Sequence, residues 1–227
     1  MFYDSNYFVF VIIPMIIGVW AQYRVSATYK QYSNIPCRNG CTGYQAARSI
    51  LDENGLRNVQ IERVKGNLTD HYDPRTNVVR LSEGVYSSNS VAAVGIAAHE
   101  CGHAVQYAQG YVPIKIRGAI VPITNFGSKL AVPLVLVGLL LSWYPLAYVG
   151  LIGYALIAVF QLVTLPVEFN ASNRAVAALS GMNITEEEQR GAKKVLSAAA
   201  LTYVAALIAA VTQLLRMAAI IGRRNRR

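Results

Sequence analysis

Four long apolar stretches constrain the fold of this 227-residue chain more than any other feature. Residues 7–23 carry no charge and are long enough to cross about 30 Å of hydrocarbon as a helix. Residues 118–142, 146–167 and 195–221 form the other three stretches. With 54% hydrophobic and 15% charged residues, the composition is typical of a membrane protein with several spans rather than of a soluble enzyme.

The second and third stretches are predicted to form a tight transmembrane hairpin. Only Trp143, Tyr144 and Pro145 separate them, and aromatic residues at such a bend suit the membrane interface. Lys129 in the first arm is expected to extend toward the interface or to face the protein interior. The first stretch is interpreted as a retained helix, because no basic segment precedes it as in a signal peptide.

His99, Glu100 and His103 form an H-E-x-x-H sequence inside an apolar run, residues 90–109, that predicts a buried helix. Positions i and i+4 share a helix face, so both imidazoles can bind one metal while the glutamate reaches the water on it. Gly102 costs about 1 kcal/mol relative to alanine in mid-helix, so another segment is expected to pass close to it. The alternative is two ordinary helix histidines beside a chance glutamate.

A catalytic zinc site usually has three protein ligands and one position for water. Glu168 is the best candidate for the third ligand, at the start of a helix that Pro166 is expected to separate from the preceding apolar stretch. It could instead be an interfacial carboxylate that pairs with Arg174 or caps the helix it begins. His71, in a turn-rich stretch, is the rival ligand; it could also contact the substrate or transition state, or be a solvated turn residue.

Three segments, HECGHAVQ, LTDHYDPRTNVVRLSEGVY and PVEFNASNRA, together resemble the bacterial neutral zinc metallopeptidases, over nearly the whole chain. The chain is also similar, more distantly, to the HtpX-like membrane peptidases, where a transmembrane hairpin separates the H-E-x-x-H helix from a glutamate ligand. The resemblance implies one Zn²⁺ held by His99, His103 and Glu168, with Glu100 as general base. HtpX-like enzymes have an aspartate four residues after the glutamate ligand, where this chain has Ser172. Its hydroxyl is expected to orient a ligand histidine, with Arg174 as a second supporting residue.

The resulting fold class is an α-rich membrane protein, a single domain over residues 1–227 with about four transmembrane helices and a small α/β zincin-like catalytic subdomain. The subdomain is expected over 24–117, with a helix capped by Thr42, strands at 59–64 and 76–82, and then the metal helix. Residues 168–194 are expected to form the third-ligand helix and a connector. Tyr203 is a candidate oxyanion contact or a packed tyrosine. The predicted substrate-binding edge strand consists of Asn77, Val78, Val79, Arg80 and Leu81.

The basic residues predict the orientation in the cell membrane. Arg24, Lys30, Lys115, Arg117, Lys193 and Lys194 flank spans on the side of the catalytic segment, which should therefore be cytoplasmic. The basic tail 222–227 conflicts with this pattern, because three spans after the metal helix would place it outside. Either the last helix does not cross the membrane fully, or the basic residues on the catalytic side outweigh the tail in setting the orientation. The net charge of +9 suits lipid headgroups, and no nucleic-acid partner is expected, because no aromatic residues interleave a basic stripe. Cys37 and Cys41 are expected to be free thiols on the cytoplasmic side, whereas an outside location would permit a disulfide between them. Cys101 is expected to pack against the core or to lie near the metal.

These features predict a zinc-dependent membrane endopeptidase. A metal-activated water would hydrolyse a protein or peptide substrate, with Glu100 as general base. Two alternatives remain open: a metal-binding membrane scaffold without turnover, and a zinc hydrolase of a lipid or other non-peptide substrate. The sequence predicts no particular oligomeric state.

Overall fold

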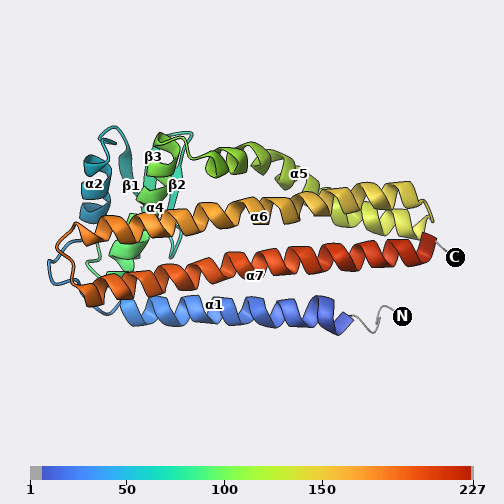
Figure 1. Ribbon diagram of the computed structural model, residues 1–227, viewed down its shortest axis with the longest axis horizontal. Helices are drawn as coiled ribbons and strands as arrows, with labels where there is room; N and C mark the ends of the chain where they lie inside the picture. The colour runs from blue at the N-terminus through green and yellow to red at the C-terminus, as the bar shows by residue number, and fades with distance from the viewer. Residues whose placement is uncertain (1–6, 226–227) are drawn as a thin grey trace. The chain divides into compact units, whose positions relative to one another are not determined.

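The structure is a computed structural model that describes residues 7–225, and Figure 1 follows the chain through its elements. Within these residues four helices are long and apolar enough to cross a membrane, at Phe8–Tyr32, Val112–Leu140, Tyr144–Ser180 and Glu186–Arg223. The first consists of a π-helical turn η1 (Phe8–Ile12) and α1 (Ile13–Tyr32). The others are α5 (Val112–Leu140), α6 (Tyr144–Ser180) and α7 (Glu186–Asn225). The expected α-rich membrane protein with four long apolar helices is confirmed.

The chain folds into two compact units. The membrane unit comprises Met1–Gln22, Lys115–Pro166 and Leu201–Arg227, and the site unit comprises Tyr23–Ile114 and Val167–Ala200. The site unit therefore differs from the expected segment 24–117: its first part ends at Ile114, and it also takes in the last part of α6, from Val167, and the first part of α7. Residues 226–227 of the basic tail lie outside the described residues.

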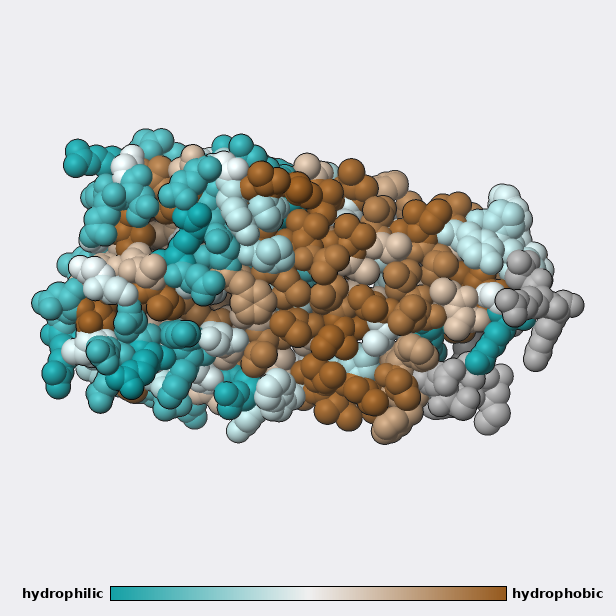
Figure 2. All heavy atoms as spheres, in the orientation of Figure 1, coloured by the Kyte–Doolittle hydropathy of each residue, from teal (hydrophilic) through white to brown (hydrophobic). Residues whose placement is uncertain are grey.

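In the membrane unit α5 and α6 form the expected hairpin, since α5 ends at Leu140 and α6 begins at Tyr144. The two helices approach closely where their residues are small: a Cβ added to Gly138 would lie 2.5 Å from the Ala147 nitrogen, and one added to Gly150 would lie 2.6 Å from the Ala131 oxygen. Close backbone approach of this kind is how helices pack in lipid. Figure 2 shows mostly hydrophobic side chains on the surface of this unit, as contact with acyl chains requires.

The expectation that Pro166 separates two helices is wrong. α6 is continuous from Tyr144 to Ser180 with Pro166 inside it, and Glu168 lies in the interior of this 37-residue helix. Proline lacks a backbone N–H and disfavours a helical conformation mainly in the residue before it, but helices in a bundle tolerate it when packing holds both halves. Glu168 is therefore held by a continuous helix rather than by the start of a new one.

The site unit begins with α2 (Gly43–Glu53), as predicted. Thr42 caps this helix: its side chain accepts a hydrogen bond from the Gln45 N–H, and the Gln45 side chain accepts one from the Thr42 N–H. Such a reciprocal capping box satisfies two of the donors that a helix N-terminus leaves unpaired. A short helix, α3 (Glu83–Tyr86), and the long helix α4 (Val91–Ala108) complete the helices that lie wholly within this unit.

A three-stranded sheet lies between α2 and α4 in sequence, with β1 (Gln60–Val64), β2 (His71–Asp73) and β3 (Val78–Ser82) in the spatial order β1-β3-β2. β3 pairs in parallel with β1 and antiparallel with β2. The expectation that residues 77–81 form an edge strand is therefore wrong, because the strand has a partner on each side and Asn77 precedes it in a left-handed conformation with φ 56°. The missed strand is β2, whose stretch was interpreted as a turn.

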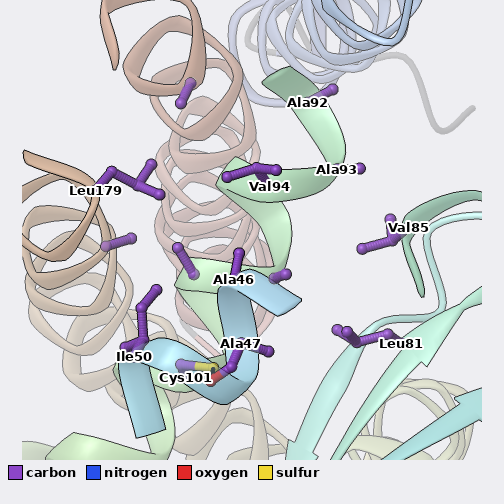
Figure 3. Close-up of a cluster of buried hydrophobic side chains, with 14 of the residues drawn as sticks. Ala46, Ala47, Ile50, Leu81, Val85, Ala92, Ala93, Val94, Cys101 and Leu179 are labelled. Atoms are coloured by element: carbon purple, nitrogen blue, oxygen red, sulfur yellow. Dashed lines mark hydrogen bonds between the residues drawn. The ribbon is translucent and has the colours of Figure 1, made fainter. Parts of the chain in front are cut away.

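α4 forms the centre of the site unit, with 14 of its 18 residues buried, which is why its sequence is almost entirely small and apolar. Figure 3 shows its Ala92, Ala93 and Val94 in one cluster with Ala46 and Ile50 of α2 and Leu179 of α6. The close approach expected at Gly102 is confirmed: a Cβ there would lie 2.7 Å from the carbonyl oxygen of Ala171 on α6. α4 and α6 therefore meet backbone to backbone, one turn along α6 from Glu168.

Candidate metal centre

α4 begins where the sequence predicts, and its register fixes the direction of both histidines. Ser90 caps the helix by accepting a hydrogen bond from the Ala93 N–H, and Gly110 follows it with a positive φ of 67°. The imidazole rings of His99 and His103 lie one turn apart on the same face, with centroids separated by 4.8 Å. Both rings are largely buried, so a cation between them would be shielded from bulk water.

Glu168 lies on α6 directly opposite this pair. Its Oε2 is 3.3 Å from Nε2 of His99 and 3.6 Å from Nε2 of His103, and the three ligand atoms all lie within 4.8 Å of one another. Two atoms bound to a tetrahedral zinc at its usual bond length of about 2.0–2.1 Å would be roughly 3.4 Å apart. Two of the three separations already match this value. The donor set, two imidazoles and one carboxylate, is one that catalytic zinc takes.

Each histidine has a polar neighbour at its other ring nitrogen. Nδ1 of His99 lies 3.2 Å from Oγ of Ser172, and Nδ1 of His103 lies 3.0 Å from Oε1 of Gln106. A partner at Nδ1 orients the ring and leaves Nε2 directed at the metal, which is the usual arrangement around zinc-binding histidines. The hydroxyl of Ser172 therefore lies within hydrogen-bonding distance of His99, as expected.

The electrostatic surroundings of His103 favour positive charge. Burial is the largest influence and lowers the pKa of His103, but the hydrogen bond to Glu168, the charges of Glu100 and Glu168, and the contact with Gln106 outweigh it and raise the pKa above its usual value. A buried site that attracts a proton in this way also attracts a divalent cation. The residues present therefore fit zinc by geometry, by donor type and by charge.

Glu100 is buried, with 8% of its surface exposed, and it contacts the start of the sheet. Its Oε2 accepts a hydrogen bond of 3.1 Å from the backbone N–H of Tyr72 in β2. Asp70, just before β2, accepts bonds from the backbone N–H and hydroxyl of Ser82. Burial and the nearby charge of Glu100 raise the pKa of Asp70, although those two bonds oppose the rise. The N-terminal end of β2 is thus fixed between β3 and the carboxylate of Glu100.

The other predicted site residues fall in different places. His71 is an exposed residue of β2 whose Nδ1 lies 2.8 Å from the Thr69 carbonyl oxygen, and it does not belong to the cluster of ligand atoms. Arg174 donates to Oδ1 of Asn170 and to Oε1 of Gln109, both at 2.7 Å. Tyr203 lies on α7 within the membrane unit, and its role stays a prediction. The side chain of Asn77 accepts a hydrogen bond at Oδ1 from the Tyr72 hydroxyl.

Sequence reasoning missed two residues that shape the site, Gln106 and Asn170. Gln106 is completely buried, and its Nε2 donates to the Val167 carbonyl and to Oδ1 of Asn170. A signal was available, because a glutamine three residues after His103 shares its helix face and has no place in an apolar core without partners.

Comparison with known proteins identifies the family of this chain. Residues 7–222 match the model of a protein family described as "Putative neutral zinc metallopeptidase". This chain belongs to that family. It is also 46% identical, over 211 residues, to a protein of Bacillus subtilis (strain 168) named "Putative membrane protease YugP", with 92% of this chain and 94% of that protein covered. No solved structure matches the chain.

Membership in the neutral zinc metallopeptidase family identifies zinc as the cofactor, and His99, His103 and Glu168 form a cluster that could hold one ion. The family match covers the site unit, the first three long apolar helices and the fourth as far as residue 222. The match therefore extends over the membrane helices and over the segments that carry His99, His103 and Glu168.

Proposed function

We propose that this protein is a zinc-dependent membrane endopeptidase in which His99, His103 and Glu168 bind the metal and Glu100 is the general base. The observation that carries the proposal is that two imidazole nitrogens and one carboxylate oxygen lie within 4.8 Å of one another. They come from two helices, and His103 and Glu168 are 65 residues apart in sequence. Glu100 adjoins His99 on the same helix. Buried carboxylates in such numbers are costly unless a cation or hydrogen bonds compensate them.

A zinc ion held by these three residues would polarise the scissile carbonyl and lower the pKa of water to about 7. Glu100 takes one proton from the attacking water as the water oxygen adds to the carbonyl carbon. Glu100 then gives this proton to the amide nitrogen, the C–N bond breaks and the amine leaves, while the carboxylic acid product keeps the water oxygen and the second water proton. The Tyr72 N–H fixes one oxygen of Glu100 and leaves the other for this transfer.

The substrate strand, in this proposal, pairs with β2 instead of β3. Among the described strands β2 has a partner on one side only, and its Tyr72 N–H already contacts Glu100. An extended peptide beside β2 would therefore place a peptide bond next to the general base, with main-chain hydrogen bonds supplying most of the contact. His71, exposed on the same strand, would contact the peptide.

The membrane location follows from the four apolar helices, and the similar protein from Bacillus subtilis is named a membrane protease. The proposal places all four as spans of the cell membrane and the site unit on the cytoplasmic side, because Arg24, Lys30, Lys115 and Arg117 border the first two spans. Cysteine-accessibility labelling from either side of intact cells, at a residue introduced beside Arg57, tests this side.

The test of the catalytic assignment is Glu100→Gln in the full-length protein purified in detergent. Glutamine keeps an oxygen that can accept the Tyr72 N–H, so the fold and the zinc content should be unchanged, while cleavage of casein and of a quenched fluorescent peptide should be abolished. A Gln variant that cleaves as fast as the parent would refute the general base. Parent protein that binds zinc but cleaves no peptide would refute the endopeptidase and favour a scaffold or a lipid hydrolase.

A further inference from the structure

Gln106 is the only completely buried side chain with a polar terminus on α4 among the described residues, apart from the H-E-x-x-H positions that lie near it. Its amide group makes three contacts: Oε1 to Nδ1 of His103 at 3.0 Å, and Nε2 to the Val167 carbonyl at 2.8 Å and to Oδ1 of Asn170 at 3.0 Å. Both amide hydrogens and the amide oxygen are therefore used. A buried glutamine whose amide oxygen and both amide hydrogens have partners has a fixed orientation.

The direction of this amide follows from its neighbours. A carbonyl oxygen only accepts, so the group facing Val167 must be the NH₂ end of Gln106. Asn170 leads to the same assignment: Arg174 has only donors, so the Asn170 atom that it contacts at 2.7 Å is the oxygen, and this oxygen also faces Nε2 of Gln106. The oxygen of Gln106 consequently faces His103.

This orientation determines the tautomer of neutral His103. An amide oxygen next to Nδ1 requires that Nδ1 carries the hydrogen, which leaves the lone pair on Nε2, the atom 3.6 Å from Oε2 of Glu168. The same amide holds the Val167 carbonyl, one residue before Glu168. A single side chain thus sets both the ring that offers one ligand and the turn of α6 that offers another.

We propose that Gln106 is a positioning residue of the metal centre: it holds His103 as the tautomer with a free Nε2 and fixes α6 so that Glu168 faces the two histidines. The expected effect of Gln106 on catalysis rests on the proposed function. The expected effect of Gln106 on zinc binding does not depend on peptide cleavage, so the role of Gln106 and the endopeptidase function can be refuted separately.

The experiment compares three variants of the full-length protein. Gln106→Met has a similar length and removes all three contacts, whereas Gln106→Glu keeps an oxygen acceptor for Nδ1–H of His103 and removes the donors to α6. Gln189→Met is the matched control, because Gln189 on α7 also donates to a carbonyl of α6, that of Val176 at 3.1 Å, and neither residue belongs to the metal cluster. Zinc dissociation constants are measured by chelator competition, and unfolding of the metal-free proteins is measured in parallel.

Gln106→Met should weaken zinc binding roughly 10- to 100-fold, the usual effect of removing a residue that orients a ligand. Gln106→Glu keeps the contact to His103 but turns its second carboxylate oxygen toward two acceptors on α6, so it should recover at most part of that loss. Gln189→Met should lower metal-free stability without changing zinc affinity. In the active protein, Gln106→Met should lower kcat with little change in KM. Zinc binding by Gln106→Met within about twofold of the parent would overturn the proposal. An equal loss in Gln189→Met would overturn it too, and so would full recovery in Gln106→Glu, which lacks the donors to α6.

Discussion

Replacing Gly102 by alanine tests whether the contact between α4 and α6 sets the geometry of the metal centre. The added Cβ would lie 2.7 Å from the Ala171 oxygen and 3.2 Å from the Ala171 Cα, both backbone atoms that cannot rotate away. Ordinary contact begins at 3.4 Å, so the helices must separate by about 0.7 Å near this point. Metal–ligand distances tolerate only about 0.2 Å, and Glu168 is one turn from Ala171 on α6.

We therefore expect Gly102→Ala to weaken zinc binding by about tenfold or more. Alanine gains about 1 kcal/mol in helix propensity, but overpacking costs about 1–3 kcal/mol, so the metal-free protein should be unchanged or less stable by up to about 2 kcal/mol. Chelator competition measures the affinity, and thermal unfolding with and without zinc measures the stability.

Gly95→Ala provides the control on the same helix. A Cβ there would meet the Cβ of Ala192 on α7 at 3.1 Å, so the strain falls on a helix that supplies no proposed metal ligand. This variant should change stability and leave zinc affinity within about twofold of the parent. If Gly102→Ala binds zinc as tightly as the parent, or if both variants lose affinity equally, the backbone contact at Ala171 does not set the site.

Further predictions concern the ligands, the supporting hydroxyl and the thiols. Glu168→Gln should remove zinc from protein purified in parallel with the parent, as metal analysis will show, because an amide is a poor zinc ligand. Ser172→Ala should weaken zinc binding by at most about tenfold, since Ser172 only orients His99; a loss as large as that of Glu168→Gln would contradict this. Free zinc at 1,000 times its dissociation constant should stabilise the fold by about 4 kcal/mol, and chelation should reverse the rise in unfolding temperature. In the native protein at pH 8, iodoacetamide should label Cys41 first, because burial raises the pKa of Cys37 to about 12 and also raises that of the fully buried Cys101 thiol.

Much of the fold follows from patterns that are local in sequence. The apolar stretches predict the long helices because length and hydropathy suffice for a span. Thr42 with Gln45 predicts the start of α2, and Gly102 predicts a close neighbour, because capping and glycine placement have local physical causes. Pro166 misled for a related reason: its local preference disfavours a helix, but packing around α6 outweighs that preference.

The sheet order depends on contacts that no local pattern encodes. β2 has only three residues, and its stretch contains aspartate, proline and threonine, which are typical of turns. It is a strand because Asp70 binds Ser82 and Glu100 accepts the Tyr72 N–H, two contacts with residues 12 and 28 positions away. The sequence predicts β3 as the edge strand because its residues have the higher strand propensity. The strand that contacts Glu100 is β2, whose sequence has the lower strand propensity.

The metal ligands could be found from the sequence because each is a costly residue in an apolar setting. Few acidic residues occur in the chain, so Glu168 within an apolar stretch needed a cation, and two histidines four residues apart on an apolar helix supplied the rest of the site. Gln106 is uncharged and is not a metal ligand, so its residue type alone does not single it out as a site residue. Its role depends on the orientation of its amide, which Val167 and Asn170 fix so that the oxygen faces His103. Residues that bind a metal leave a chemical signal in the sequence, whereas residues that orient the ligands require the geometry of both helices.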